Sequence, residues 1–238
     1  MSENTGARSA GSTQRTRRTG RAGPGEQPRQ WEVRAALRAM DRVGDNGGRS
    51  IAHDIVDAAW DLMLTSEVTD FTVKQVAERA NVALQTLYRH FGSKDELLLA
   101  MFEEAIDQGS RAFIAESARY QPVERLHHLV TAPFLFTYDD RAQRINRWRA
   151  RERQRLIEAF PHEVEAVVEP YRAAVVDAIV AVCDAGDGSC DDPEMAGTIV
   201  THLVQTMTLA VHGGGLVADS EALAERVWRL CWQGLAIR

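Results

Sequence analysis

The stretch from Thr72 to Lys94, TVKQVAERANVALQTLYRHFGSK, constrains the fold more than any other part of this sequence. Thr72 and Gln75 fit a capping box, in which each side chain accepts a hydrogen bond from a free backbone N–H at a helix start. Apolar residues then recur at helical spacing as far as Ala80. Asn81 tolerates a positive φ and can end such a helix. The pattern predicts a short helix followed by a tight turn.

A second short helix is predicted from about Ala83 to Phe91, with Leu87 and Phe91 facing inward and a polar face outward. Ser93 and Glu96 fit a second capping box, which would open a further helix. Two short helices joined by a tight turn, the second with a polar outer face, describe a helix-turn-helix. In that unit the second helix enters the major groove of DNA.

The same residues resemble the TetR family of bacterial transcriptional repressors. The family pattern is a Thr-Val helix start, an Ala near the end of that helix, then T-L-Y-x-H-F and a Ser-Lys that opens the next helix. This chain has Thr72-Val73, Ala77, Thr86-Leu87-Tyr88-Arg89-His90-Phe91 and Ser93-Lys94. The close match covers about residues 50–107, and the rest agrees in length and helical character.

The resemblance implies that the second helix reads DNA. The family often has Ser and Gly where this chain has Ala83 and Gln85, so the bases that it reads are expected to differ. Gln can pair with adenine, while Thr86 and Leu84 can touch a thymine methyl group. Other residues are expected to hold phosphates. The predicted DNA-binding residues are Thr72, Lys74, Leu84, Gln85, Thr86, Tyr88, Arg89, His90 and Lys94.

The charge of the chain is unevenly distributed around a net value of −6. Residues 1–48 hold nine Arg and five acidic residues, whereas residues 49–107 hold five basic and eleven acidic residues. Within residues 74–94, however, four basic residues accompany one acidic residue. Salt screens charges beyond roughly 8 Å, so this local excess decides DNA affinity.

The predicted fold is all-α, with three parts. Residues 1–48 are interpreted as a flexible Arg-rich extension, residues 49–95 as the helix-turn-helix domain and residues 96–238 as a helical domain for ligand binding and dimerisation. A short extra helix can form within residues 31–43. A long helix from Ser93 to about Tyr120 would link the two domains. Further helices are predicted near 122–137, 140–159, 162–184, 192–213 and 219–236, separated by Pro or Gly signals.

The Arg-rich extension leaves two interpretations open, a solvated tail or a basic arm that adds DNA contacts. The sequence contains no run of 18 apolar residues, so no membrane helix is predicted. The N-terminus also lacks the apolar core of a secretory signal. Cys183, Cys190 and Cys231 show no metal-binding spacing. These features favour a cytoplasmic protein without a metal or cofactor.

Seven Arg lie between residues 141 and 155. They form either a solvated basic surface or, in part, a site for an anionic effector such as an acyl-coenzyme A. A neutral hydrophobic effector is the other possibility. The aromatic residues nearby are core residues or line an apolar cavity. The predicted ligand-binding residues are Phe134, Tyr138, Trp148, Tyr171, His202 and Thr206.

Apolar stripes on the last two predicted helices need a partner, which a second copy of the chain or the rest of the monomer can supply. The resemblance favours a homodimer built from these helices. The predicted interface residues are Leu203, Met207, Leu223, Val227, Trp228 and Leu230. The sequence thus predicts a dimeric repressor that binds palindromic operator DNA and is released by a small molecule. The alternative is an all-α enzyme or carrier with an incidental helix-turn-helix, although no catalytic motif supports it.

Overall fold

The computed structural model describes residues 28–40, 48–65, 71–135, 140–214 and 219–234, and the regular structure in these ranges is helical. The predicted all-α fold is confirmed. The helices are α1 (Gln30–Met40), α2 (Gly48–Thr65), α3 (Val73–Arg79), α4 (Leu84–His90), α5 (Lys94–Ser117), α6 (Pro122–Leu135), α7 (Asp140–Ala159), α8 (Pro161–Asp184), α9 (Pro193–His212) and α10 (Ser220–Gly234).

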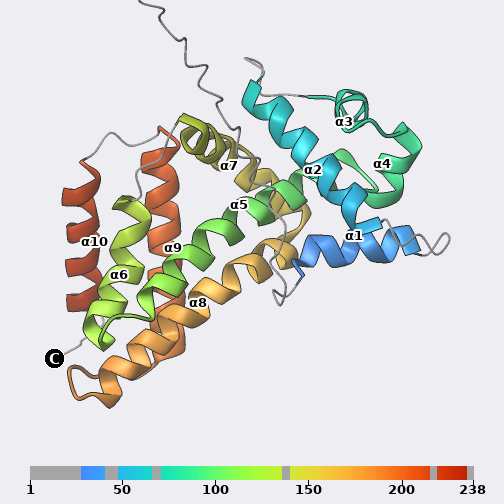
Figure 1. Ribbon diagram of the computed structural model, residues 1–238. Helices are drawn as coiled ribbons and strands as arrows, with labels where there is room; N and C mark the ends of the chain where they lie inside the picture. The colour runs from blue at the N-terminus through green and yellow to red at the C-terminus, as the bar shows by residue number, and fades with distance from the viewer. Residues whose placement is uncertain (1–27, 41–47, 66–70, 136–139, 215–218, 235–238) are drawn as a thin grey trace, which may run out of the picture.

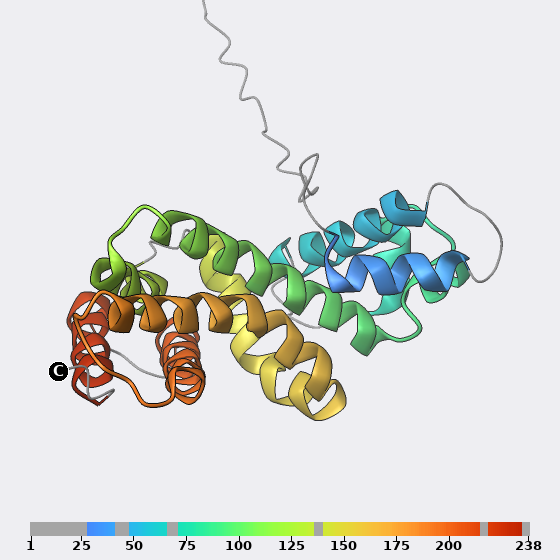
Figure 2. The same cartoon turned by 90° about the horizontal axis from the view of Figure 1, so that it is seen from below.

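Helix α5 connects the two halves of the molecule. In Figure 1 it runs from the group α1–α4 on the right to α6, α9 and α10 on the left, beside α8. Figure 2 shows the same pairing of α5 with α8 from below. A shift of α5 therefore moves the helix-turn-helix relative to the C-terminal helices.

The buried apolar side chains form two clusters. The first lies among α1–α5 and also takes in Trp148 and Leu156 of α7 and Val164 of α8. The second lies among α6, α8, α9 and α10. The first cluster extends along α5 as far as Ile106, so the first half of α5 packs with the helix-turn-helix.

The local signals at the helix-turn-helix act as expected. The Gln75 N–H donates to Thr72 Oγ1 at 3.3 Å, and the Thr72 N–H donates to Gln75 Oε1 at 2.8 Å, which completes the capping box. Asn81 has φ of 56°, the positive value that the turn requires. At the start of α5, Ser93 Oγ accepts from the Glu96 N–H at 3.1 Å. The Glu96 carboxylate accepts instead from the Gly92 N–H, at 3.3 Å, so the second capping box is only half formed.

The extra helix expected within residues 31–43 is present as α1. Trp31 and Ala35 are 1% and 2% exposed, so this helix is packed into the first cluster. The interpretation of residues 1–48 as a flexible extension is therefore wrong for residues 30–40. The arginine cluster at residues 15–21 lies outside the described residues.

Two further properties concern the described ranges alone. None of the helices within them has the length and apolar character to cross a membrane. The side chains described there also contain no group of three or more His, Cys, Asp or Glu that could hold a metal ion.

Helices α8 and α9 cross closely at Gly197. A Cβ atom at this position would lie 2.3 Å from Val176 Cγ2 and 3.4 Å from the backbone of Val176. Gly197→Ala should destabilise the protein, because overpacking costs about 1–3 kcal/mol and outweighs the helix preference of Ala over Gly, about 1 kcal/mol. Urea unfolding measures the change in free energy.

Gly109→Ala in α5 is the matched control, because the nearest atom to its new Cβ would be 3.9 Å away. This variant should be as stable as the parent or more so. Adding Val176→Ala to Gly197→Ala removes the clashing methyl groups and should recover part of the loss. Equal stability of the two glycine variants would show that the helices do not cross this closely.

Candidate functional site

The helix-turn-helix presents a packed inner face and an open outer face. Val76 of α3 and Leu87 of α4 are completely buried, and Phe91 at the end of α4 is 3% exposed. On the other side, Leu84 and Tyr88 are 41% and 45% exposed. Large side chains at this level of exposure on a firmly packed helix are available to bind a partner surface.

The predicted DNA-binding residues lie mostly on this outer face. Thr72, Lys74, Leu84, Gln85 and Tyr88 are exposed, and Thr86, Arg89 and Lys94 are partly exposed.

His90 does not belong to this face. The prediction that it faces outward is wrong, because its side chain is 3% exposed. It follows the buried Leu87 by three residues, and residues at this spacing lie on the same side of a helix. The direct phosphate contact expected for His90 therefore has no support in this structure.

The positive charges around α3 and α4 remain accessible. Lys74 Nζ lies 3.9 Å from Glu78 Oε1, and both side chains are mainly exposed. Such a pair is weak and can yield to a phosphate. Lys94 Nζ lies 5.3 Å from the centre of the Phe71 ring, which holds its ammonium group beside the start of α3.

Comparison with known proteins agrees with this geometry. Residues 55–101 match the family described as bacterial regulatory proteins, tetR family. A TetR transcriptional regulator from Rhodococcus sp. RHA1 has a similar structure, with a TM-score of 0.56 and 22% identity over 77% of this chain and 96% of that one. The helix-turn-helix domain of this chain therefore belongs to the tetR family of bacterial regulatory proteins. Members of this family are non-enzymatic DNA-binding proteins.

Two other solved structures share the fold of this chain. A TetR transcription regulator from Haloarcula marismortui has a TM-score of 0.59 and 15% identity over 79% of this chain and 99% of that one. The regulator FadR from Bacillus subtilis, in complex with stearoyl-CoA, has a TM-score of 0.57 and 18% identity over 76% of this chain and 97% of that one. No curated protein sequence matches this chain.

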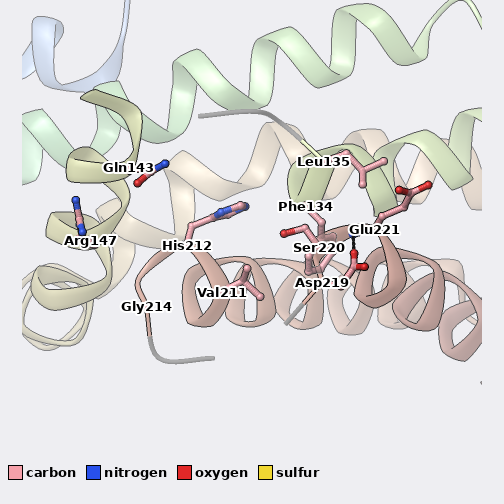
Figure 3. A pocket seen from close by; sticks show the side chains of 10 residues that line it. All are labelled: Phe134, Leu135, Gln143, Arg147, Val211, His212, Gly214, Asp219, Ser220 and Glu221. Carbon is pink, nitrogen blue, oxygen red and sulfur yellow. Dashed lines mark hydrogen bonds between the residues drawn. The ribbon is translucent and has the colours of Figure 1, made fainter. Parts of the chain in front are cut away.

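A cavity of about 550 Å³ opens in the C-terminal half of this chain, where α6 and α9 end and α10 begins. Figure 3 shows Gln143 and Arg147 of α7 on one side of it, His212 in the middle and the start of α10 on the other side. The residues that line the cavity are Phe134, Leu135, Gln143, Arg147, Val211, His212, Gly214, Asp219, Ser220 and Glu221.

Only one of the predicted ligand-binding residues lines this cavity within the described part of the chain, namely Phe134. Trp148 is buried against Trp60 in the first cluster, and the hydroxyl of the buried Tyr171 donates to the Leu129 carbonyl in the second. His202 and Thr206 are exposed on α9 and do not line this cavity, so the prediction that they do is wrong. Tyr138 lies outside the described residues.

The ionisable side chains of the cavity differ in whether their charge is free to bind a ligand. His212 Nε2 lies 3.3 Å from the Pro133 carbonyl oxygen, and burial lowers the pKa of this histidine. Its ring is therefore mainly neutral near pH 7. Asp219 accepts from two backbone N–H groups at the start of α10, those of Glu221 and Ala222. Arg147 is exposed and supplies a permanent positive charge to the cavity wall.

Helix α7, which carries the Arg-rich stretch, also contacts the helix-turn-helix domain. Arg144 Nη1 donates to the Leu64 carbonyl at the end of α2 at 2.5 Å. Arg155 Nη1 lies 2.7 Å from Asp95 Oδ1 in the first turn of α5. The rings of Trp148 and Trp60 meet edge to face with their centres 5.2 Å apart. Sequence reasoning missed this role, because spacing along a helix does not identify tertiary partners.

Helices α9 and α10 keep an apolar outer face. Met195 and Ile199 of α9 and Leu230 of α10 are 56%, 57% and 62% exposed. Among the predicted interface residues, Leu203, Met207, Leu223 and Trp228 are half-buried against the second cluster. Val227 is 4% exposed and points into this monomer, so its assignment to the outer face is wrong.

The outer face of α4 leads to a prediction about operator reading. Gln85→Ala should change the preferred bases, because a side chain paired with one base contributes about 1–3 kcal/mol of discrimination. Lys94→Ala should weaken all sequences alike and lower the salt dependence of binding by about one phosphate contact. Mobility shifts on single-base variants of the DNA upstream of the gene, at two salt concentrations, measure both effects.

Gln154→Ala removes an exposed amide of the same kind from α7, outside the helix-turn-helix, and is the matched control. It should bind every variant as the parent does. If Gln85→Ala keeps the parent's order of preference, Gln85 does not read bases.

Proposed function

We propose that this chain is a homodimeric repressor that binds a palindromic operator through α4 and releases it when an effector occupies the cavity beside α7. The observation that carries the proposal is the position of α7, which lines the cavity with Gln143 and Arg147 and holds the helix-turn-helix domain with Arg144 and Arg155. A footprint on the DNA upstream of the gene, with and without effector, tests it.

In this proposal Gln85, Thr86 and Leu84 contact base edges, and residues around them bind the phosphates of the DNA backbone. The supporting observation is their exposure on a helix whose opposite side is packed. Thr72, Lys74, Tyr88, Arg89 and Lys94 border the same surface and suit phosphate contacts. A dimer would place two such helices in successive major grooves, about 34–36 Å apart.

Dimerisation is proposed through α9 and α10. Three large apolar side chains on their outer faces are more than half exposed, and such patches mark protein interfaces when they lie together. Both helices lie at the end of the molecule away from α3 and α4 (Figure 1). A two-fold axis there would leave α4, the recognition helix, free to contact DNA in both copies of the chain.

The proposed interface predicts the effect of a charge in its centre. Ile199→Glu should shift the protein to monomers at micromolar concentration, because an uncompensated buried charge costs about 3–5 kcal/mol. Sedimentation velocity measures the change. Val33→Glu, on an exposed residue of α1, is the matched control and should stay dimeric. A monomeric parent protein would contradict the interface altogether.

Effector binding would reach the DNA through α7. A ligand that displaced Gln143 or Arg147 would move the helix that also holds the Leu64 carbonyl and Asp95. Release requires that the ligand bind better to the form with displaced recognition helices than to the DNA-binding form. A ligand of equal affinity for both forms would leave the operator bound.

An effector with an anionic part is proposed, for instance an acyl-coenzyme A. Arg147 supplies a positive charge to a cavity that also has an apolar wall of Phe134, Leu135 and Val211. The similarity in fold to FadR in complex with stearoyl-CoA supports the same class of ligand. The nearby acids Asp219 and Glu221 oppose an anion, but Asp219 is already engaged by backbone N–H groups.

The proposed ligand chemistry predicts an order among three compounds. Palmitoyl-coenzyme A and palmitate should release the upstream DNA, whereas the neutral ester methyl palmitate should not. Arg147→Gln should raise the concentration of palmitate needed for release by roughly tenfold, the effect of one lost charge-assisted hydrogen bond. Mobility shifts with increasing ligand measure the release.

Arg141→Gln removes a similarly exposed charge from the same helix outside the cavity and should leave release unchanged. Equal release by all three compounds would remove any role for the charge. Release by none of them would contradict the fatty acyl class.

A further inference from the structure

Three arginines at the N-terminal end of the described chain bind acidic residues of α5. The pairs are Arg29 with Glu104 and Asp107, Arg34 with Glu103, and Arg38 with Glu96, at N–O distances of 2.5–3.0 Å. Residue numbers rise along α1 as they fall along α5, so the two helices run antiparallel. We call these pairs the arginine ladder.

The inner pairs of the ladder are almost closed to water. The Arg29 and Glu104 side chains are 8% and 6% exposed, and that of Glu103 is 3% exposed. Burial raises the pKa of Glu103, against the opposite effect of Arg34. The Trp31 backbone N–H also donates to Glu103, at 3.0 Å. Separating these buried charges would be costly, so the pairs hold this end of α1 against α5.

The outer end of the ladder reaches the connection between α4 and α5. Glu96 accepts from Arg38 at 2.8 Å with one oxygen and from the Gly92 N–H at 3.3 Å with the other. The Arg38 guanidinium covers Gly92 closely, since a Cβ there would lie 2.1 Å from its Nη1. The Trp31 ring is centred 6.3 Å from that of Phe91, which ends α4. Helix α1 therefore contacts Phe91 and Gly92, two of the three residues that connect α4 to α5.

The recognition helix needs outside support of this kind. It has seven residues, and its N-cap is Ala83, whose side chain cannot accept a hydrogen bond. Isolated helices this short are not stable in water. Its direction is set by its neighbours, which include α1, α2 and α3. Of these, α1 lies outside residues 55–101, the part matched by the family.

We infer that α1 positions the recognition helix for operator binding, through the arginine ladder on α5 and the contacts of Trp31 and Arg38 with residues 91–96. The ladder fixes α1 on α5, and α1 then holds the end of α4 at one angle to α5. The inference rests on the proposed DNA reading by α4. Arg38 acts through α4 and is a positioning residue.

Arg38→Gln tests the inference with little risk to the fold, because its side chain is 44% exposed. Affinity for the upstream DNA duplex that the footprint identifies should fall roughly tenfold, which is the loss expected for one base contact. Affinity for an unrelated duplex, and its dependence on salt, should not change. Loss of a direct phosphate contact would instead weaken both duplexes and lower the salt dependence by about one unit.

Hydrogen exchange of the free protein provides a readout that needs no DNA. Amides of residues 84–93 should exchange faster in Arg38→Gln and in Trp31→Leu, while those of α9 should not change. Arg172→Gln removes a partly exposed arginine of α8 that pairs with Glu169 and Glu194, outside the arginine ladder, and both measurements should match the parent.

Unchanged exchange at residues 84–93 in both variants would overturn the positioning role. Faster exchange with unchanged affinity for the upstream duplex would show that α1 orders α4 while α4 does not read that DNA. That result would count against the proposed function as well. Equal weakening on both duplexes would make Arg38 a phosphate contact and overturn the inference.

Discussion

The buried carboxylate of Glu104 joins the helices on which the rest of the structure depends. One of its oxygens accepts from Arg29 at 2.7 Å, and the other accepts from the Trp60 indole N–H at 2.8 Å. Trp60 in turn packs its ring against Trp148 of α7. Because a buried charge without partners is very costly, these groups must stay together in the folded chain. The polypeptide before α1, together with α2, α5 and α7, is thereby held at one point.

This arrangement accounts for part of the acidic charge in and next to the helix-turn-helix domain. Residues 49–107 carry eleven acidic residues, an unfavourable composition for contact with phosphates. Glu103, Glu104 and Asp107, however, pair with Arg29, which precedes α1, and Arg34, which belongs to it. Their charge is neutralised inside the protein. The basic character of the N-terminal extension thus has a structural use in Arg29, Arg34 and Arg38.

The sequence predicts the elements of this fold well, because their signals are local. The capping box at Thr72, the positive φ of Asn81 and the helical spacing before Ala80 all act over a few residues. His90 is the exception: the sequence pattern predicts it on the outer face of α4, but it follows Leu87 by three residues and is buried on the same side.

The candidate sites were less predictable, because they depend on contacts between distant segments. Nothing in the spacing of the Arg-rich stretch indicates that Arg144 meets the Leu64 carbonyl. On α10, apolar residues lie on both sides, so the sequence alone does not distinguish Val227, which packs inside, from Leu230, which faces out. The cavity forms where the ends of four helices meet, and of the residues expected there that the structure describes, only Phe134 lines it.

The placement of the tryptophans gives this protein built-in optical probes. Trp60 and Trp148 meet at the junction between the two halves, while Trp228 and Trp232 lie 5.0 Å apart on α10. Coupled aromatic rings produce near-ultraviolet circular dichroism that depends on their mutual angle. Movement at the junction and rearrangement of α10 would therefore alter the spectrum of the unlabelled chain, with Trp148→Phe and Trp232→Phe separating the two contributions.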